Sequence, residues 1–107
     1  MTILFAPHAK SLFQDILLSL EDELSTADAI RWHDKIIEAV TQLADSPLSC
    51  PNVPLACFLE IPPNPERLRQ LICKPYRIVY EVVGEECRIL SIRHGRMLVT
   101  TVDTRWN

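Results

Sequence analysis

The sequence is poor in glycine: its 107 residues include only Gly84 and Gly95, against eight prolines. Phosphate-binding loops of the Walker type and the dinucleotide-binding fingerprint both need several glycines at fixed spacing, because the backbone must approach the phosphates closely. The sequence therefore contains neither motif. We therefore expect no nucleotide cofactor, and no other cofactor is predicted.

Long apolar runs and zinc-type cysteine pairs are also absent. Charged residues interrupt the apolar stretches, so no segment is expected to span a bilayer. Residues 1–11 lack a positive region followed by an apolar run, which predicts a cytoplasmic location rather than secretion. The cysteines include no Cys-x-x-Cys pair, so we expect free thiols and no metal site. They are Cys50, Cys57, Cys73 and Cys87.

The formal net charge of −3 hides an uneven distribution along the chain. Residues 1–66 hold three basic and ten acidic residues, whereas residues 67–107 hold eight basic and four acidic ones. Seven of those eight basic residues are arginines, which bind phosphates and carboxylates through two parallel hydrogen bonds. The pattern is compatible with a solvated sheet face, and also with an anionic partner such as nucleic acid or an acidic protein segment.

The first half of the chain predicts one strand followed by two helices. Residues 1–6 form a short apolar run, typical of a strand. Across residues 8–46 apolar side chains recur every three or four positions, in two stretches that are interrupted at Ser25 and Thr26 and end before Pro47. Because the connector is so short, the two helices must fold back as an antiparallel hairpin.

The second half predicts a loop and then a sheet. Six prolines make residues 47–66 a rigid, ordered loop with one short strand around residues 56–61. From residue 67 the apolar period changes to two, which predicts an antiparallel meander over residues 67–94, followed by a tail of residues 95–107. Its three strands are expected at 67–73, 76–83 and 87–93.

Taken together, these elements predict a single α+β domain over residues 1–107. The expected order is βααβββ, with the helical hairpin packed on a small antiparallel sheet.

This order, combined with three short motifs, resembles the RelE/ParE superfamily of toxins from bacterial type II toxin–antitoxin modules. The second helix ends in Leu-Ala-Asp-Ser-Pro at residues 43–47, and Tyr-Arg-Ile-Val-Tyr occupies residues 76–80. The last strand closes with His94-Gly95-Arg96. The likeness covers about residues 2–97 and implies the same fold, a cognate antitoxin as partner and a growth-inhibiting activity.

The resemblance leaves two mechanisms open. RelE-like members cleave ribosome-bound mRNA, and that chemistry needs basic groups with a proton acceptor and a donor. Arg77, His94 and Glu60 are the catalytic residues expected if the chain is a nuclease. However, the family's two strand lysines fall on Leu68 and Gln70, and no tyrosine follows residue 80.

ParE-like members instead poison DNA gyrase by binding it, and the missing lysines and tyrosine favour this interpretation. Four arginines are then expected to dock an acidic antitoxin or target surface through charge-assisted pairs. They are Arg69, Arg77, Arg93 and Arg96. A homodimer, a non-toxic remnant that only binds its antitoxin, and a nucleic-acid-binding module without toxicity are further hypotheses.

Overall fold

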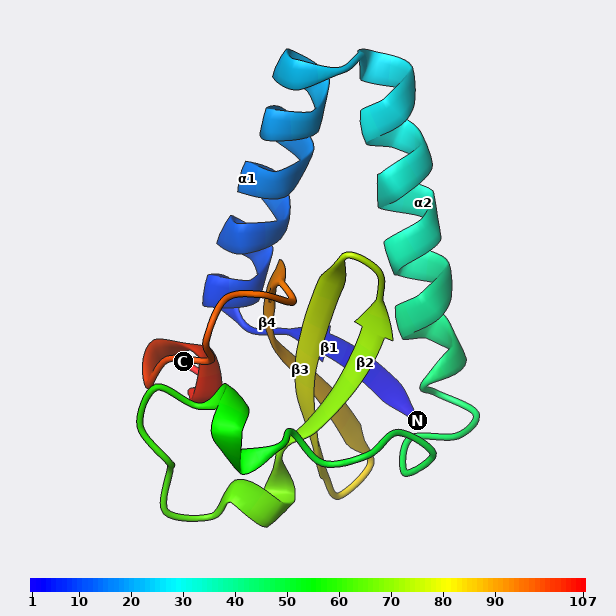
Figure 1. The fold of residues 1–107 in the computed structure, drawn as a ribbon. Coiled ribbons are helices and arrows are strands. Elements are labelled where there is room, and N and C mark those ends of the chain that lie inside the picture. The colour runs from blue at the N-terminus through cyan, green and yellow to red at the C-terminus, as the bar shows by residue number, and fades with distance from the viewer.

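The computed structural model describes all 107 residues as a helical hairpin on a four-stranded sheet (Figure 1). The predicted order βααβββ is confirmed, with three 3₁₀ turns added. The elements are β1 (Thr2–Phe5), α1 (Pro7–Glu23), α2 (Thr26–Gln42), β2 (Arg69–Cys73), β3 (Tyr76–Val83) and β4 (Glu86–His94), with η1 (Leu55–Cys57), η2 (Pro65–Arg67) and η3 (Val102–Thr104).

The predicted helical hairpin is present, and its turn is set by local hydrogen bonds. Pro7 occupies the first turn of α1, where its missing N–H leaves no helical bond unmade. Ser25 caps α2: its Oγ accepts the backbone N–H of Asp28 at 3.1 Å and donates to the Asp28 carboxylate at 2.7 Å. The closed end of the hairpin projects beyond the sheet (Figure 1).

The sheet has the strand order β1-β4-β3-β2 and is mixed. The antiparallel meander of β2, β3 and β4 is confirmed, and Gly84 supplies the positive φ of 58° in its second turn. The predicted small antiparallel sheet is extended to a mixed one, because β1 pairs with β4 in the parallel direction, from Thr2 opposite Glu86 to Phe5 opposite Ile89. β1 therefore pairs with the edge of β4 that the meander leaves open.

The helices cover one face of this sheet, α1 over β4 and α2 over β2. Ile78 and Tyr80 point toward them and are fully buried. The hydroxyl of Tyr80 donates to the carbonyl of Pro47 at 2.7 Å, just beyond α2, and the ring of Trp32 meets Tyr76 edge-on at 5.2 Å. No helix of the structure is both long and apolar enough to cross a membrane.

The Pro-rich loop and the C-terminal segment pair with each other. The short strand expected around residues 56–61 is wrong: η1 occupies residues 55–57, and a single parallel bridge joins Phe58 to Val99. Two backbone hydrogen bonds flank this bridge, from Leu59 to the Val99 carbonyl and from Val99 to the Cys57 carbonyl. Pro54 precedes this segment and Pro62 and Pro63 follow it, so a ladder cannot continue past these residues in either direction.

Candidate functional site

Arg77 ties three parts of the chain together from the middle of the sheet. Its Nε donates to the side chain of Gln70 on β2 at 2.9 Å. One terminal nitrogen donates to the carbonyl of Met97 at 3.1 Å, and the other to the sulfur of Cys57 at 3.4 Å. The guanidinium is therefore committed to holding the Pro-rich loop and the C-terminal segment against the sheet.

Arg93 is the register partner of Arg77 on β4, and it forms an ion pair inside the chain. Its Nε lies 2.9 Å from each carboxylate oxygen of Asp103, a residue with no exposed surface. His8 at the start of α1 lies 2.7 Å from the same carboxylate, and Thr100 donates to it from its backbone and its hydroxyl. This network anchors the C-terminal segment to β4 and α1.

The Asp103 carboxylate stays ionised because of these partners. Burial by itself would raise the pKa of Asp103, but the hydrogen bonds from the Thr100 backbone, Arg93 and His8, together with the positive charge of Arg93, hold that pKa below its ordinary value. A buried carboxylate with five hydrogen-bond contacts is a structural anchor. No buried side-chain polar atom in the structure lacks a partner.

The other two arginines differ in their availability. Arg69 donates to the carbonyls of Leu48 at 3.3 Å and Cys50 at 2.6 Å, and so fixes the chain that follows α2. Arg96 is exposed, and its side chain makes no hydrogen bond or ion pair. Of the four arginines expected to dock a partner, Arg96 alone presents a free guanidinium.

His94 and Glu60 lie apart from Arg77. His94 pairs across the strands with Tyr76, whereas Arg77 is the next residue along β3, and successive residues of a strand point to opposite faces. The His94 ring accordingly meets the ring of Tyr76 at 6.3 Å, and its Nδ1 accepts the backbone N–H of Arg96. Glu60 is exposed in the Pro-rich loop beside Thr101, at 3.5 Å.

The three predicted nuclease residues therefore do not lie together. Arg77 and His94 lie on opposite faces of the sheet, and Glu60 lies in the Pro-rich loop. It also shows partners that sequence reasoning missed, namely Asp103, His8, Gln70 and Cys57. One signal for Asp103 was present, since it is the only acidic residue after Glu86 in a stretch that holds four arginines. No group of three or more histidine, cysteine or acidic side chains is placed to hold a metal ion, and the four cysteines are free.

A family model described as "ParE toxin of type II toxin-antitoxin system, parDE" matches residues 3–99, which include both α-helices, β2, β3, β4 and all of β1 except Thr2. The chain belongs to the ParE toxin family. The family assignment selects the ParE side of the predicted RelE/ParE resemblance, in accordance with the absence of the strand lysines and the late tyrosine.

The fold of this ParE-family chain also matches a solved structure, described as the chromosomal ParDE TA system from P. aeruginosa. The TM-score is 0.69 over 88% of this chain and 95% of that chain, at 19% sequence identity. At this identity the likeness establishes the fold, two helices on a four-stranded mixed sheet. No curated protein sequence matches the chain.

Proposed function

We propose that the chain inhibits bacterial growth by binding a cellular target, which is DNA gyrase, and that a cognate antitoxin neutralises it in the cytoplasm. Membership of the ParE toxin family supports this proposal.

One observation favours a binding toxin over a nuclease: Arg77 and His94 point to opposite faces of the sheet. General acid–base cleavage requires the proton-transfer group and the charge-stabilising group to reach the same phosphate at hydrogen-bond distance. In addition, all three nitrogens of the Arg77 guanidinium already donate to groups within the chain. Three of the five guanidinium N–H groups are thus used inside the chain, which leaves two for a phosphate and ties the side chain to the C-terminal segment.

Controlled expression in bacteria, with and without the product of the adjacent reading frame, tests the proposal. We expect expression of the chain alone to slow growth with filamentation and DNA damage, while protein synthesis continues. Co-expression of the neighbouring product should restore growth. An immediate arrest of translation, or growth that is unaffected by expression, would contradict the proposed function.

A further inference from the structure

The two edges of the sheet are protected unequally. Residues 51–53 of the Pro-rich loop cover part of the β2 edge, because Asn52 forms a bridge with Arg69 and two backbone hydrogen bonds flank that bridge. β1 forms the other edge, and no segment of the chain pairs with its outer side. An uncovered strand edge presents unpaired N–H and C=O groups to any chain that can reach it.

Ile3 and Phe5 hold the open backbone groups of β1. The N–H groups of Thr2 and Ala6 donate toward β4. Since successive residues of a strand direct their N–H and C=O groups to opposite sides, those of Ile3 and Phe5 point away from the sheet. β1 also lacks the usual features that protect an edge, because it contains no charged residue, no proline and no bulge.

An apolar hollow of about 310 Å³ adjoins this edge on the helical side of the sheet. Phe5 lines it from β1, and Phe13 and Leu17 line it from α1. Ile37 contributes from α2, and Lys10 is the one side chain of fixed charge in the lining. Because Phe5 belongs both to the hollow and to the open strand edge, a single partner can cover both.

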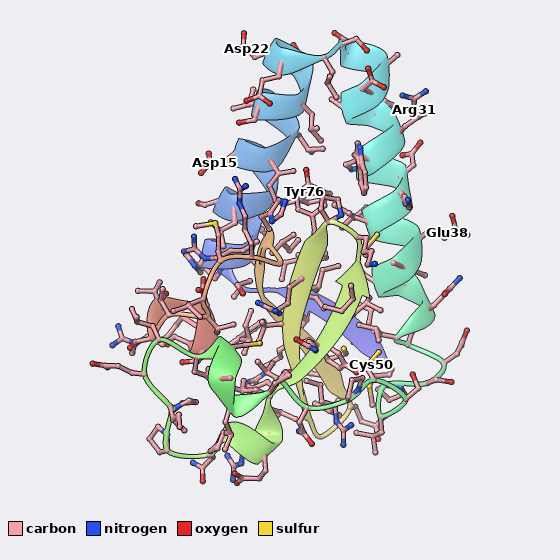
Figure 2. The ribbon with its side chains drawn as sticks, viewed as in Figure 1. Asp15, Asp22, Arg31, Glu38, Cys50 and Tyr76 are labelled. Atoms are coloured by element: carbon pink, nitrogen blue, oxygen red, sulfur yellow. The ribbon has the colours of Figure 1, made fainter.

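The charges of the helical hairpin are mostly directed away from this hollow. Asp15 and Asp22 project from the side of α1 turned away from α2, and Arg31 and Glu38 project from the side of α2 turned away from α1 (Figure 2). None of these four residues lines the hollow. Recognition at the β1 edge therefore depends on backbone hydrogen bonds and apolar contact rather than on charge.

We propose that the β1 edge is a self-association surface, on which β1 pairs in the antiparallel direction with β1 of a second copy of this chain. A strand edge can pair with itself about a two-fold axis, because both copies then contribute the same groups. One register uses all the open groups: Ile3 lies opposite Phe5 of the second copy, and Leu4 lies opposite Leu4 on the axis. The two sheets then form one continuous sheet.

The side chains favour a second copy over an unrelated strand. Ile3 and Phe5 pack against the core on the helical side. In the proposed register a β-branched side chain lies opposite an aromatic one twice, which is a favourable cross-strand combination. The two-fold axis is perpendicular to the sheet, so both hollows lie on the same face, beside this pair of strands. The symmetry supplies all these groups, and the proposal does not depend on the proposed function.

Sedimentation velocity of the full-length chain over a concentration series tests the proposal. We expect the weight-average mass to rise from the 12.3 kDa of one chain toward twice that value. Ile3→Lys should raise the dissociation constant about tenfold, because each dimer loses two cross-strand pairs and gains two charges at the edge. The matched control is Ile72→Lys on β2, the other edge, where the side chain is 47% exposed and no change is expected.

Leu4→Cys tests the register and does not rely on the Ile3→Lys variant. In the proposed dimer residue 4 faces its own copy in a non-hydrogen-bonded pair, where opposite Cβ atoms lie within about 5.5 Å. Leu4→Cys should therefore give a disulfide-linked dimer under mild oxidation with copper phenanthroline. Thr2→Cys, on the same face but opposite residue 6, should not. The wild type with its four free cysteines measures the background, and thermal melting checks that each variant folds.

A chain that sediments as a monomer at every concentration would overturn the proposal. A dimer that dissociates in Ile72→Lys but not in Ile3→Lys would also overturn it, because the β2 edge would then be the interface. The same holds for equal cross-linking of Leu4→Cys and Thr2→Cys. If the Ile3 and Phe5 amides of a monomer gain protection from hydrogen exchange only when the product of the adjacent reading frame is added, the antitoxin and not a second copy occupies the edge.

Discussion

Arg93 and Asp103 form an ion pair in which one guanidinium nitrogen lies 2.9 Å from both oxygens of a carboxylate that has no exposed surface. The pair joins the last strand to a segment near the C-terminus, and His8 ties the same carboxylate to the start of α1. Residues 97–105 are therefore part of the folded body: Val99 and Asp103 are both buried. Removal of this segment would test folding rather than partner binding.

Asp103→Asn should lower the free energy of unfolding by about 3 kcal/mol, since it leaves Arg93 without its counter-charge and weakens the hydrogen bond to His8. The Arg93 side chain is 24% exposed and can recover some hydration, which limits the loss. Urea denaturation at pH 7 measures the effect. The control is Asp34→Asn, at a side chain that is 73% exposed, where a change below about 0.5 kcal/mol is expected. Similar losses in both variants would contradict the anchoring role of Asp103.

The contribution of Asp103 should depend on pH in a defined direction. Its pKa in the folded state lies below the ordinary value, so its stabilisation is fully present above about pH 5 and fades as the pH falls through and below about 4. The difference in unfolding free energy between the wild type and Asp103→Asn should therefore shrink between pH 6 and the acid range. A difference that stays constant down to pH 3 would show that folding does not lower the pKa of Asp103.

Arg77→Lys should loosen the contact between the Pro-rich loop and the C-terminal segment, because a lysine cannot reach Gln70, Cys57 and Met97 together. We expect a loss of about 1–2 kcal/mol in stability. Faster hydrogen exchange should appear at the amides of Leu59 and Val99, which bridge the two segments. Amides in the middle of α2 serve as the internal control. Unchanged exchange at Leu59 and Val99 would contradict this role for Arg77.

The cysteines should divide into two reactivity classes under native conditions. Burial, followed by the influence of Cys50, raises the pKa of Cys87 to about 11, and its side chain is fully buried. Since the thiolate is the reactive form, Cys87 should label slowly with a maleimide at pH 7, as should buried Cys73. Cys50 and Cys57 are partly exposed and should label first. Peptide mapping by mass spectrometry distinguishes the sites, and early labelling of Cys87 would show that β4 is not packed as described.

The local elements could be predicted from the sequence because their signals are local. Apolar spacing of three and four identifies both helices, the Ser25 and Asp28 pair marks the start of α2, and the change to period two marks the meander. The direction of β1 could not be predicted, because a short apolar strand carries no information about which neighbour it joins or in which sense.

The roles of the arginines were harder to predict for a related reason. The sequence shows that Arg77 and Arg93 lie on adjacent strands, but it does not show the partners they find beyond the sheet. Met97 is 20 residues from Arg77, and Asp103 is 10 residues from Arg93. A cluster of arginines in a sequence therefore does not distinguish a docking surface from an internal network. Only Arg96 remains free for the role expected of all four.

A comparison of two reactions with the purified chain tests the central claim, that this protein acts by binding and not by cleavage. The chain should inhibit supercoiling by DNA gyrase, and it should leave mRNA on programmed ribosomes intact. His94→Ala should retain the inhibition, because inhibition by binding needs no proton-transfer group. Cleavage of the ribosome-bound mRNA that disappears in His94→Ala, with an unchanged melting temperature, would contradict the account.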